Sequence, residues 1–177
     1  MISEKLKHDP SNRWQEKISV SSKAKNLSDI TEDKQLKKKN YGILVHDILS
    51  RIRQPEEVEK AVQAVIYEGV ISEKEKEILV KQIEELLGMN EIAAFFDTSW
   101  KFMNEREIIL PDGRLLRPDR VIYNNTETKI IDFKTGKKQK SHADQVNEYG
   151  DTLAQMAYPG IRKFLVYITE KEVVEIT

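Results

Sequence analysis

The spacing of apolar residues divides the chain into a polar segment, a helical part and a part built from strands. Residues 1–40 are polar and show neither the helical period nor the strand period of apolar residues, which is typical of a linker or of a segment that docks on another surface. From residue 41 to about 97, apolar residues recur at three- and four-residue steps, the period of amphipathic helices. From Trp100 onward the period changes to two, as in strands. We therefore expect one domain over residues 41–177, with a helical part at 41–97 and a sheet core at 98–177.

The helical part predicts three helices and a short turn. The first carries an apolar stripe that begins at Tyr41. The second follows Pro55 over residues 56–68 and ends at Gly69. The third is capped by Ser72 with Glu75, a capping box. Its apolar positions are Ile78, Leu79, Ile83, Leu86 and Leu87.

The sheet core predicts five strands and one helix. The expected strands are residues 100–110, 115–123, 128–133, 163–169 and 173–176, and the helix is 141–156. Residues 111–114 form a hairpin turn between the first two strands. Pro118, which cannot donate to a central ladder, indicates a bend or an edge beside Asp119. The order of elements predicts an α/β fold, a mixed central sheet flanked by helices.

Composition narrows the function classes only moderately. The 29 basic and 30 acidic residues give a net charge of −1, so any contact with nucleic acid needs a local basic patch. The chain has no cysteine, which excludes disulfides, zinc–thiolate sites and iron–sulfur clusters. It also lacks a membrane-spanning apolar run and the apolar core of a signal peptide. We expect a soluble, cytoplasmic protein.

Two aspartates carry the candidate chemistry. Asp119 and Asp132 are equidistant from a midpoint inside the turn-rich stretch 123–128. If the hairpin folds about that midpoint, the two residues stand opposite each other with Cβ atoms about 5 Å apart. Strand alternation then places Lys134 on the same face as Asp132, and Phe133 on the other.

Close carboxylates repel, and a hard cation such as Mg²⁺ relieves that repulsion most easily. A lysine beside such a site can hold a phosphate oxygen or the attacking water, whose pKa the metal lowers. The alternative is an exposed hairpin on which charge pairs merely solvate one face. Apolar Ile130, Ile131 and Phe133 surround the motif, however, and burying a carboxylate without a partner is costly. The pattern therefore favours a metal site that acts on a phosphate.

The motifs resemble those of a known family. Arg-Pro-Asp-Arg at 117–120 and Asp-Phe-Lys-Thr-Gly at 132–136 resemble the PD-(D/E)XK nuclease superfamily. More narrowly, the chain resembles the RecB-like nuclease domain at the C-terminus of RecB- and AddA-type helicase–nucleases. His46 lies in a segment similar to that family's helical histidine motif, and Gln145 with Tyr149 matches its Q-x-x-x-Y motif. Glu105 resembles the acidic residue on the strand before the Pro-Asp pair. The match runs in the family's order over roughly residues 40–177.

The resemblance implies a restriction-endonuclease-like fold and metal-dependent hydrolysis of DNA phosphodiesters, as an exonuclease acting on DNA ends. It implies that Mg²⁺ (or Mn²⁺) is held by His46, Asp119, Asp132 and the backbone carbonyl of Phe133. Lys134 and Glu105 would complete the catalytic set. Because Glu105 and Glu107 share a face of the expected strand, the sequence leaves open which of them reaches the metal.

Candidate DNA contacts are less specific. Gln145 and Tyr149 lie one turn apart on a helix, and either they orient DNA, with the ring stacking on a base, or the tyrosine is simply packed. Lys137 and Lys138 either meet the phosphate backbone or are solvated. His8 and His142 lack any motif context, and we expect both at the surface.

The chain has no G-x-x-x-x-G-K-[ST] motif and hence no P-loop motor of its own. Since RecB-like domains work beside such a motor, we expect a helicase partner in the same polypeptide or complex, in DNA repair or recombination. Two alternatives remain open. One is a catalytically inactive nuclease-like module that guides DNA for a motor protein, and the other is an interaction domain with incidental charges.

Overall fold

The computed structural model describes the backbone of residues 34–177 and the side chains from Tyr41 onward. The expected linker or docking segment therefore lies mostly outside the described residues. The helix expected from Tyr41 begins at Lys34. None of the described helices combines the length and apolar character that crossing a membrane requires.

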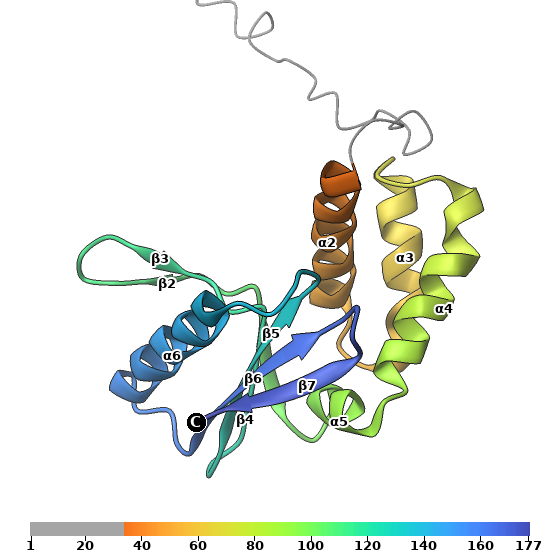
Figure 1. The fold of residues 1–177 in the computed structure, drawn as a ribbon. Helices are drawn as coiled ribbons and strands as arrows, with labels where there is room; N and C mark the ends of the chain where they lie inside the picture. The colour runs from red at the N-terminus through yellow and green to blue at the C-terminus, as the bar shows by residue number, and fades with distance from the viewer. Residues whose placement is uncertain (1–33) are drawn as a thin grey trace, which may run out of the picture.

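A five-stranded mixed sheet forms the centre of the fold (Figure 1). Its strands lie in the order β1 (Lys101–Asn104), β4 (Arg120–Tyr123), β5 (Thr128–Lys134), β6 (Ile161–Tyr167) and β7 (Glu172–Ile176). The β5–β6 pair is parallel and the other pairs are antiparallel. Helix α6 (Lys140–Gln155) connects the two parallel strands, as a parallel crossover requires.

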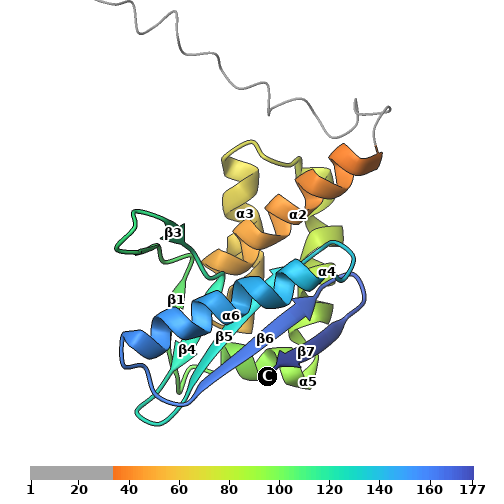
Figure 2. The same ribbon diagram turned by 60° about the vertical axis from the view of Figure 1, so that its left-hand side comes forward.

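Helices cover both faces of this sheet (Figure 2). Apolar side chains of α6 pack on one face, and four further helices supply most of the cluster on the other. These four are α2 (Lys34–Arg51), α3 (Val58–Tyr67), α4 (Lys76–Leu87) and α5 (Asn90–Ala93), with short 3₁₀ turns at Pro55–Glu57, Glu73–Glu75 and Ala94–Phe96. The expected α/β fold with a mixed sheet flanked by helices is confirmed.

Local sequence signals account for several helix boundaries. Pro55 opens the turn that leads into α3, as expected. The backbone N–H of Ser72 donates to Glu75 Oε2 at 2.8 Å, which is the reciprocal half of the predicted capping box. Ile78, which shares the apolar pattern of α4, is 62% exposed and does not join the core.

Two of the expected long strands are interrupted. The strand predicted over 100–110 breaks after β1 because Glu105 adopts a φ of 49°, in the left-handed region that non-glycine residues rarely occupy. The strand predicted over 115–123 breaks before β4, where Pro118 lies. The residues between form a separate two-stranded ribbon, β2 (Ile108–Ile109) and β3 (Leu115–Leu116). The prediction of two continuous strands was wrong, although the turn between them is where we expected it.

A buried arginine at the start of β4 links the end of α2 to the sheet by hydrogen bonds. Arg120, the first residue of β4, is 2% exposed, and its guanidinium stacks 4.0 Å from the ring centroid of Phe96. It donates to the backbone carbonyls of Phe95 (2.8 Å), Ile52 (3.0 Å) and Arg53 (3.2 Å). Two of these carbonyls follow directly after the end of α2, where helical carbonyls lack partners. Burial lowers the pKa of Arg120 to about 10.

A glycine lets the same helix approach the end of β5. A Cβ atom on Gly42 would lie 2.5 Å from Thr135 Oγ1, which is too close for any side chain without a shift. The close approach fixes α2 against the residue that follows β5, and His46 lies one helical turn further along α2.

Candidate metal centre and active site

The predicted register of the two aspartates is observed. Arg120 pairs with Ile131 in the antiparallel β4–β5 ladder, and continuing that register by one residue sets Asp119 opposite Asp132. Asp119 Oδ2 also accepts a hydrogen bond from the backbone N–H of Phe133 at 2.7 Å. Asp119 therefore lies across the end of β5, beside the strand that carries Asp132.

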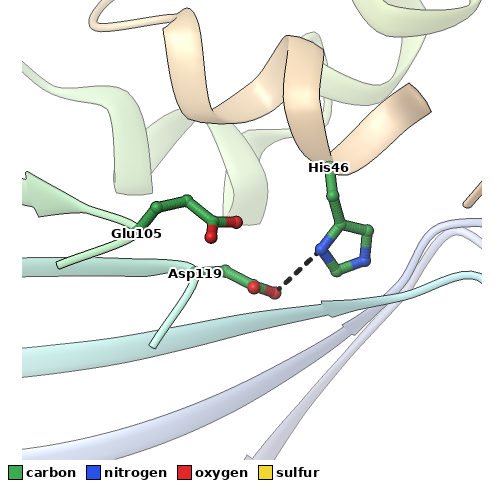
Figure 3. Close-up of side chains that lie close together, drawn as sticks. All are labelled: His46, Glu105 and Asp119. Carbon is green, nitrogen blue, oxygen red and sulfur yellow. Dashed lines mark ion pairs between the residues drawn. The ribbon is translucent and has the colours of Figure 1, made fainter. Parts of the chain in front are cut away.

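Three potential ligands converge at this point (Figure 3). His46 Nδ1 from α2 lies 3.3 Å from Asp119 Oδ2. One ligand atom each from His46, Glu105 and Asp119 lie within 4.8 Å of one another. Oxygen ligands on opposite sides of Mg²⁺ are about 4.2 Å apart, so small side-chain shifts would close the three around one ion.

The break in the first strand places the two glutamates in different surroundings. The positive φ of Glu105 ends the regular alternation of strand faces, so Glu105 and Glu107 no longer share a face. Glu105 joins His46 and Asp119, whereas Glu107 is exposed on the ribbon. Of the two glutamates, Glu105 is the one that lies beside the other candidate ligands, and its role at a metal stays a prediction.

Asp132 and Lys134 form a buried ion pair on the α6 side of the sheet. Lys134 Nζ lies 2.5 Å from Asp132 Oδ2, and Asp132 is 2% exposed. Lys134 is the one ion-pair partner that the described residues give this oxygen, whereas burial and the charge of Asp119 both disfavour the ionised carboxylate. A buried carboxylate in such a position is a group that a further cation would stabilise.

Phe133 separates the two faces, as expected from strand alternation. Its side chain packs in the cluster formed by α2 to α5, with its ring centroid 6.4 Å from that of His46. In a strand, the N–H and C=O of one residue point toward the same neighbour. Because the N–H of Phe133 donates to Asp119, its carbonyl faces the same side, toward the ligand cluster. This geometry is compatible with the carbonyl as a ligand.

A chain of hydrogen bonds fixes the lysine from the α6 side. Lys134 Nζ donates to Gln145 Oε1 at 2.9 Å, and Gln145 Nε2 donates to the hydroxyl of Tyr149 at 2.6 Å. That hydroxyl in turn donates to the carbonyl of Arg117 at 3.4 Å. Tyr149 is 4% exposed, which leaves no ring face for base stacking and agrees with the packed-tyrosine alternative. Gln145 and Tyr149 thus position the lysine.

The electrostatics of the cluster favour a bound cation. Burial, reinforced by the charge of Asp119, raises the pKa of Asp132 to about 6. Burial and the same charge raise the pKa of Glu105. Burial alone would lower the pKa of His46, but its contact with Asp119 outweighs this and raises the pKa overall. The raised pKa values of Asp132 and Glu105 show that negative charge is crowded here, and a divalent metal would relieve that crowding and displace the protons of the two carboxyl groups.

The remaining candidate residues, two lysines and two histidines, lie outside the ligand cluster or outside the described residues. Lys137 and Lys138 are exposed on the loop after β5, and Lys138 Nζ pairs with Glu172 Oε1 at 2.6 Å. Their contact with DNA stays a prediction. His142, expected at the surface, is half-buried, with Nδ1 3.3 Å from the hydroxyl of Tyr167. Burial and the nearby charge of Lys134 lower the pKa of His142. His8 lies outside the described residues.

One contact at the site has no signal in the sequence pattern. Arg117 Nε lies 2.9 Å from Glu105 Oε2, although the arginine side chain is 59% exposed. The break at Glu105 brings the pair together, and no periodic signal in the sequence announces that break. An arginine next to the Pro-Asp pair was the only hint.

The sequence model of the PD-(D/E)XK nuclease superfamily matches residues 21–175. A search of the curated proteins finds no match. The matched range contains every residue of the site described above.

Proposed function

Because the chain belongs to the PD-(D/E)XK nuclease superfamily, whose members are metal-dependent nucleases, we propose that it hydrolyses DNA phosphodiester bonds at this site. We assign the cation as Mg²⁺, with Mn²⁺ as a substitute, and the activity as exonucleolytic. The observation that carries the proposal is the convergence of His46, Glu105 and Asp119 beside the buried Asp132–Lys134 pair.

We assign each residue a role from its position in the site. His46, Asp119, Asp132 and the carbonyl of Phe133 would hold the cation, with Glu105 beside them in the cluster. A divalent cation there lowers the pKa of the attacking water and offsets charge on the phosphate oxygens. Lys134 has the position to donate to that water or to a non-bridging oxygen.

Gln145 and Tyr149 support this chemistry indirectly. Their hydrogen bonds direct the lysine ammonium toward Asp132 without carrying a net charge. A fixed donor needs little reorganisation when charge develops on the phosphate. Rate rather than DNA affinity should therefore respond to changes in these two residues.

The narrower RecB-like assignment rests on motif order: the histidine on α2, Glu105, the aspartates with Lys134, and the Gln145–Tyr149 pair on α6. It supports DNA ends as substrate and a helicase motor as partner, in repair or recombination. The histidine motif is supported by the close approach of α2 to β5 at Gly42, which brings His46 to the site.

The test is cleavage of end-labelled linear DNA and covalently closed circles with Mg²⁺, Mn²⁺ or EDTA. Lys134→Ala is the inactivating variant, and Lys163→Ala is its matched control. Lys163 lies on neighbouring β6 and donates to Asn147 of α6 at 2.8 Å, much as Lys134 donates to Gln145. We expect metal-dependent loss of the label by wild type and Lys163→Ala, none by Lys134→Ala, and intact circles.

Other outcomes would change specific parts of the proposal. Cutting of circles contradicts the exonuclease assignment while preserving the nuclease. DNA binding without cleavage by the wild type supports the inactive guiding module or a requirement for the motor. Equal cleavage by both lysine variants would remove Lys134 from the mechanism.

A further inference from the structure

The β2–β3 ribbon starts and ends at the candidate site. The ribbon occupies the interval between Glu105 and Asp119, and the backbone N–H of Glu105 donates to the carbonyl of Asp119 at 3.0 Å to close its base. From there the ribbon projects away from the sheet (Figures 1 and 2). Two of the three clustered ligand residues are therefore the two ends of one projecting element.

The two faces of the ribbon differ sharply. On the inner face Leu116 is 8% exposed, and its partner Ile108 packs in the same cluster against α6. On the outer face Ile109 and Leu115 lie directly opposite each other and are 75% and 58% exposed. The other large exposed apolar side chains of the described residues lie on helices or in loops, so this is a singular cross-strand apolar pair.

A positively charged residue, Arg117, lies between this outer face and the site. Arg117, two residues after Leu115, is 59% exposed and contacts Glu105. Ribbon residues 106–117 contain three arginines and two acidic residues, a positive balance in a chain whose net charge is −1. Moving outward from the ligand cluster, one meets a guanidinium and then two aliphatic side chains.

We propose that the outer face of the ribbon receives the DNA strand that enters the site, with Arg117 on a phosphate and Ile109 and Leu115 against the bases. The inference deepens the proposed function and depends on it for the identity of the ligand. Its occupant follows from continuity, because a strand whose phosphate lies at the cluster must continue over a surface that borders it. Guanidinium groups match phosphate geometry, and aliphatic side chains contact and unstack bases.

The test compares two double variants at exposed positions. Ile109→Ser with Leu115→Ser alters the ribbon, and Ile78→Ser with Val70→Ser is the control, since Ile78 and Val70 are 62% and 44% exposed in the helical part. Binding is measured by fluorescence anisotropy on an oligonucleotide duplex with a single-stranded overhang, with Ca²⁺ in place of Mg²⁺. A 2-aminopurine at the junction reports base unstacking, and light scattering reports the oligomeric state.

We expect the ribbon variant to bind about tenfold more weakly than wild type and to lose the 2-aminopurine signal, while the control variant matches wild type. Equal binding and equal signal in the ribbon variant would overturn the proposal. So would a wild-type dimer that the ribbon substitutions convert to a monomer with unchanged DNA binding, because the face would then serve a second copy.

Failure of the proposed function is distinguishable from failure of this inference. A wild-type protein that binds DNA through the ribbon but cleaves none with any metal supports the ribbon proposal and moves the site's assignment to the inactive guiding module or to a nuclease that needs its motor. A wild type that cleaves DNA while the ribbon variant binds normally contradicts the ribbon proposal alone.

Discussion

Replacing Asp132 by asparagine should inactivate the site and yet stabilise the metal-free fold. Asp132 is 2% exposed, and burial together with the charge of Asp119 raises its pKa from 3.8 to about 6. The folded protein therefore binds a proton at Asp132 more tightly than the unfolded chain does. The contribution of this protonated carboxyl group to stability is fully present below about pH 4 and is lost as the pH rises through about 6. Two pKa units correspond to about 3 kcal/mol of lost stability at neutral pH.

The expected result is a gain in the free energy of unfolding. With EDTA at pH 8, Asp132→Asn should be more stable than wild type by about 1 to 3 kcal/mol in urea titrations, and the gain should nearly vanish at pH 4. Asp144→Asn, an exposed carboxylate on α6, is the control and should change stability by less than about 0.5 kcal/mol.

Metal should reverse the order of stability. Mg²⁺ at about 100 times its Kd would stabilise the wild type by about 2.7 kcal/mol, and the variant by much less because it lacks a charged ligand. If Asp132→Asn were less stable than wild type in EDTA at pH 8, the ion pair with Lys134 would outweigh burial. The reasoning on the buried carboxylate would then be refuted.

Three further predictions concern residues that position the site. Gly42→Ala should weaken metal binding and lower the free energy of unfolding by about 1 to 3 kcal/mol, because the new methyl group overpacks the contact with Thr135. Adding Thr135→Ala should restore both properties, because it removes the oxygen 2.5 Å from that methyl group; failure of this rescue would contradict the contact. Arg120→Met should lower the free energy of unfolding by about 3 kcal/mol or more, because it leaves buried carbonyls without a donor. Arg162→Met breaks ion pairs at the surface and a contact with the Phe164 ring, and it should cost less than about 1 kcal/mol in the same urea titration; equal costs would contradict the buried role of Arg120. Tyr149→Phe removes the hydroxyl that holds Gln145 and should lower kcat about three- to tenfold with KM for DNA unchanged. A rise in KM alone would instead indicate a direct DNA contact.

Local patterns predicted the parts of the fold that local physics determines. The symmetric spacing of Asp119 and Asp132 about a turn-rich stretch predicted their cross-strand register, and the β4–β5 ladder has that register. The helical period and the capping box predicted α3 and α4 to within a few residues. The flanking apolar residues predicted that the acidic motif is buried.

Other features depend on contacts between distant segments and could not be read from periodicity. The left-handed conformation of Glu105 splits a continuous apolar-alternating run into β1 and the ribbon. The burial of Arg120 depends on distant groups that surround its guanidinium, namely three carbonyls of the helical part, the Asn104 side chain and two phenylalanine rings. His142 is drawn toward the site by the hydroxyl of Tyr167, which lies on the strand beside β5.

The most direct test of the central claim is anomalous diffraction from crystals soaked in Mn²⁺, since the claim is that this cluster holds the cation used for cleavage. We expect one or two anomalous peaks bounded by His46, Asp119 and Asp132, about 2.0 to 2.3 Å from their ligand atoms, and none in Asp132→Asn crystals. A strong peak elsewhere, or an empty cluster in crystals of a protein that cleaves DNA with Mn²⁺, would contradict this claim.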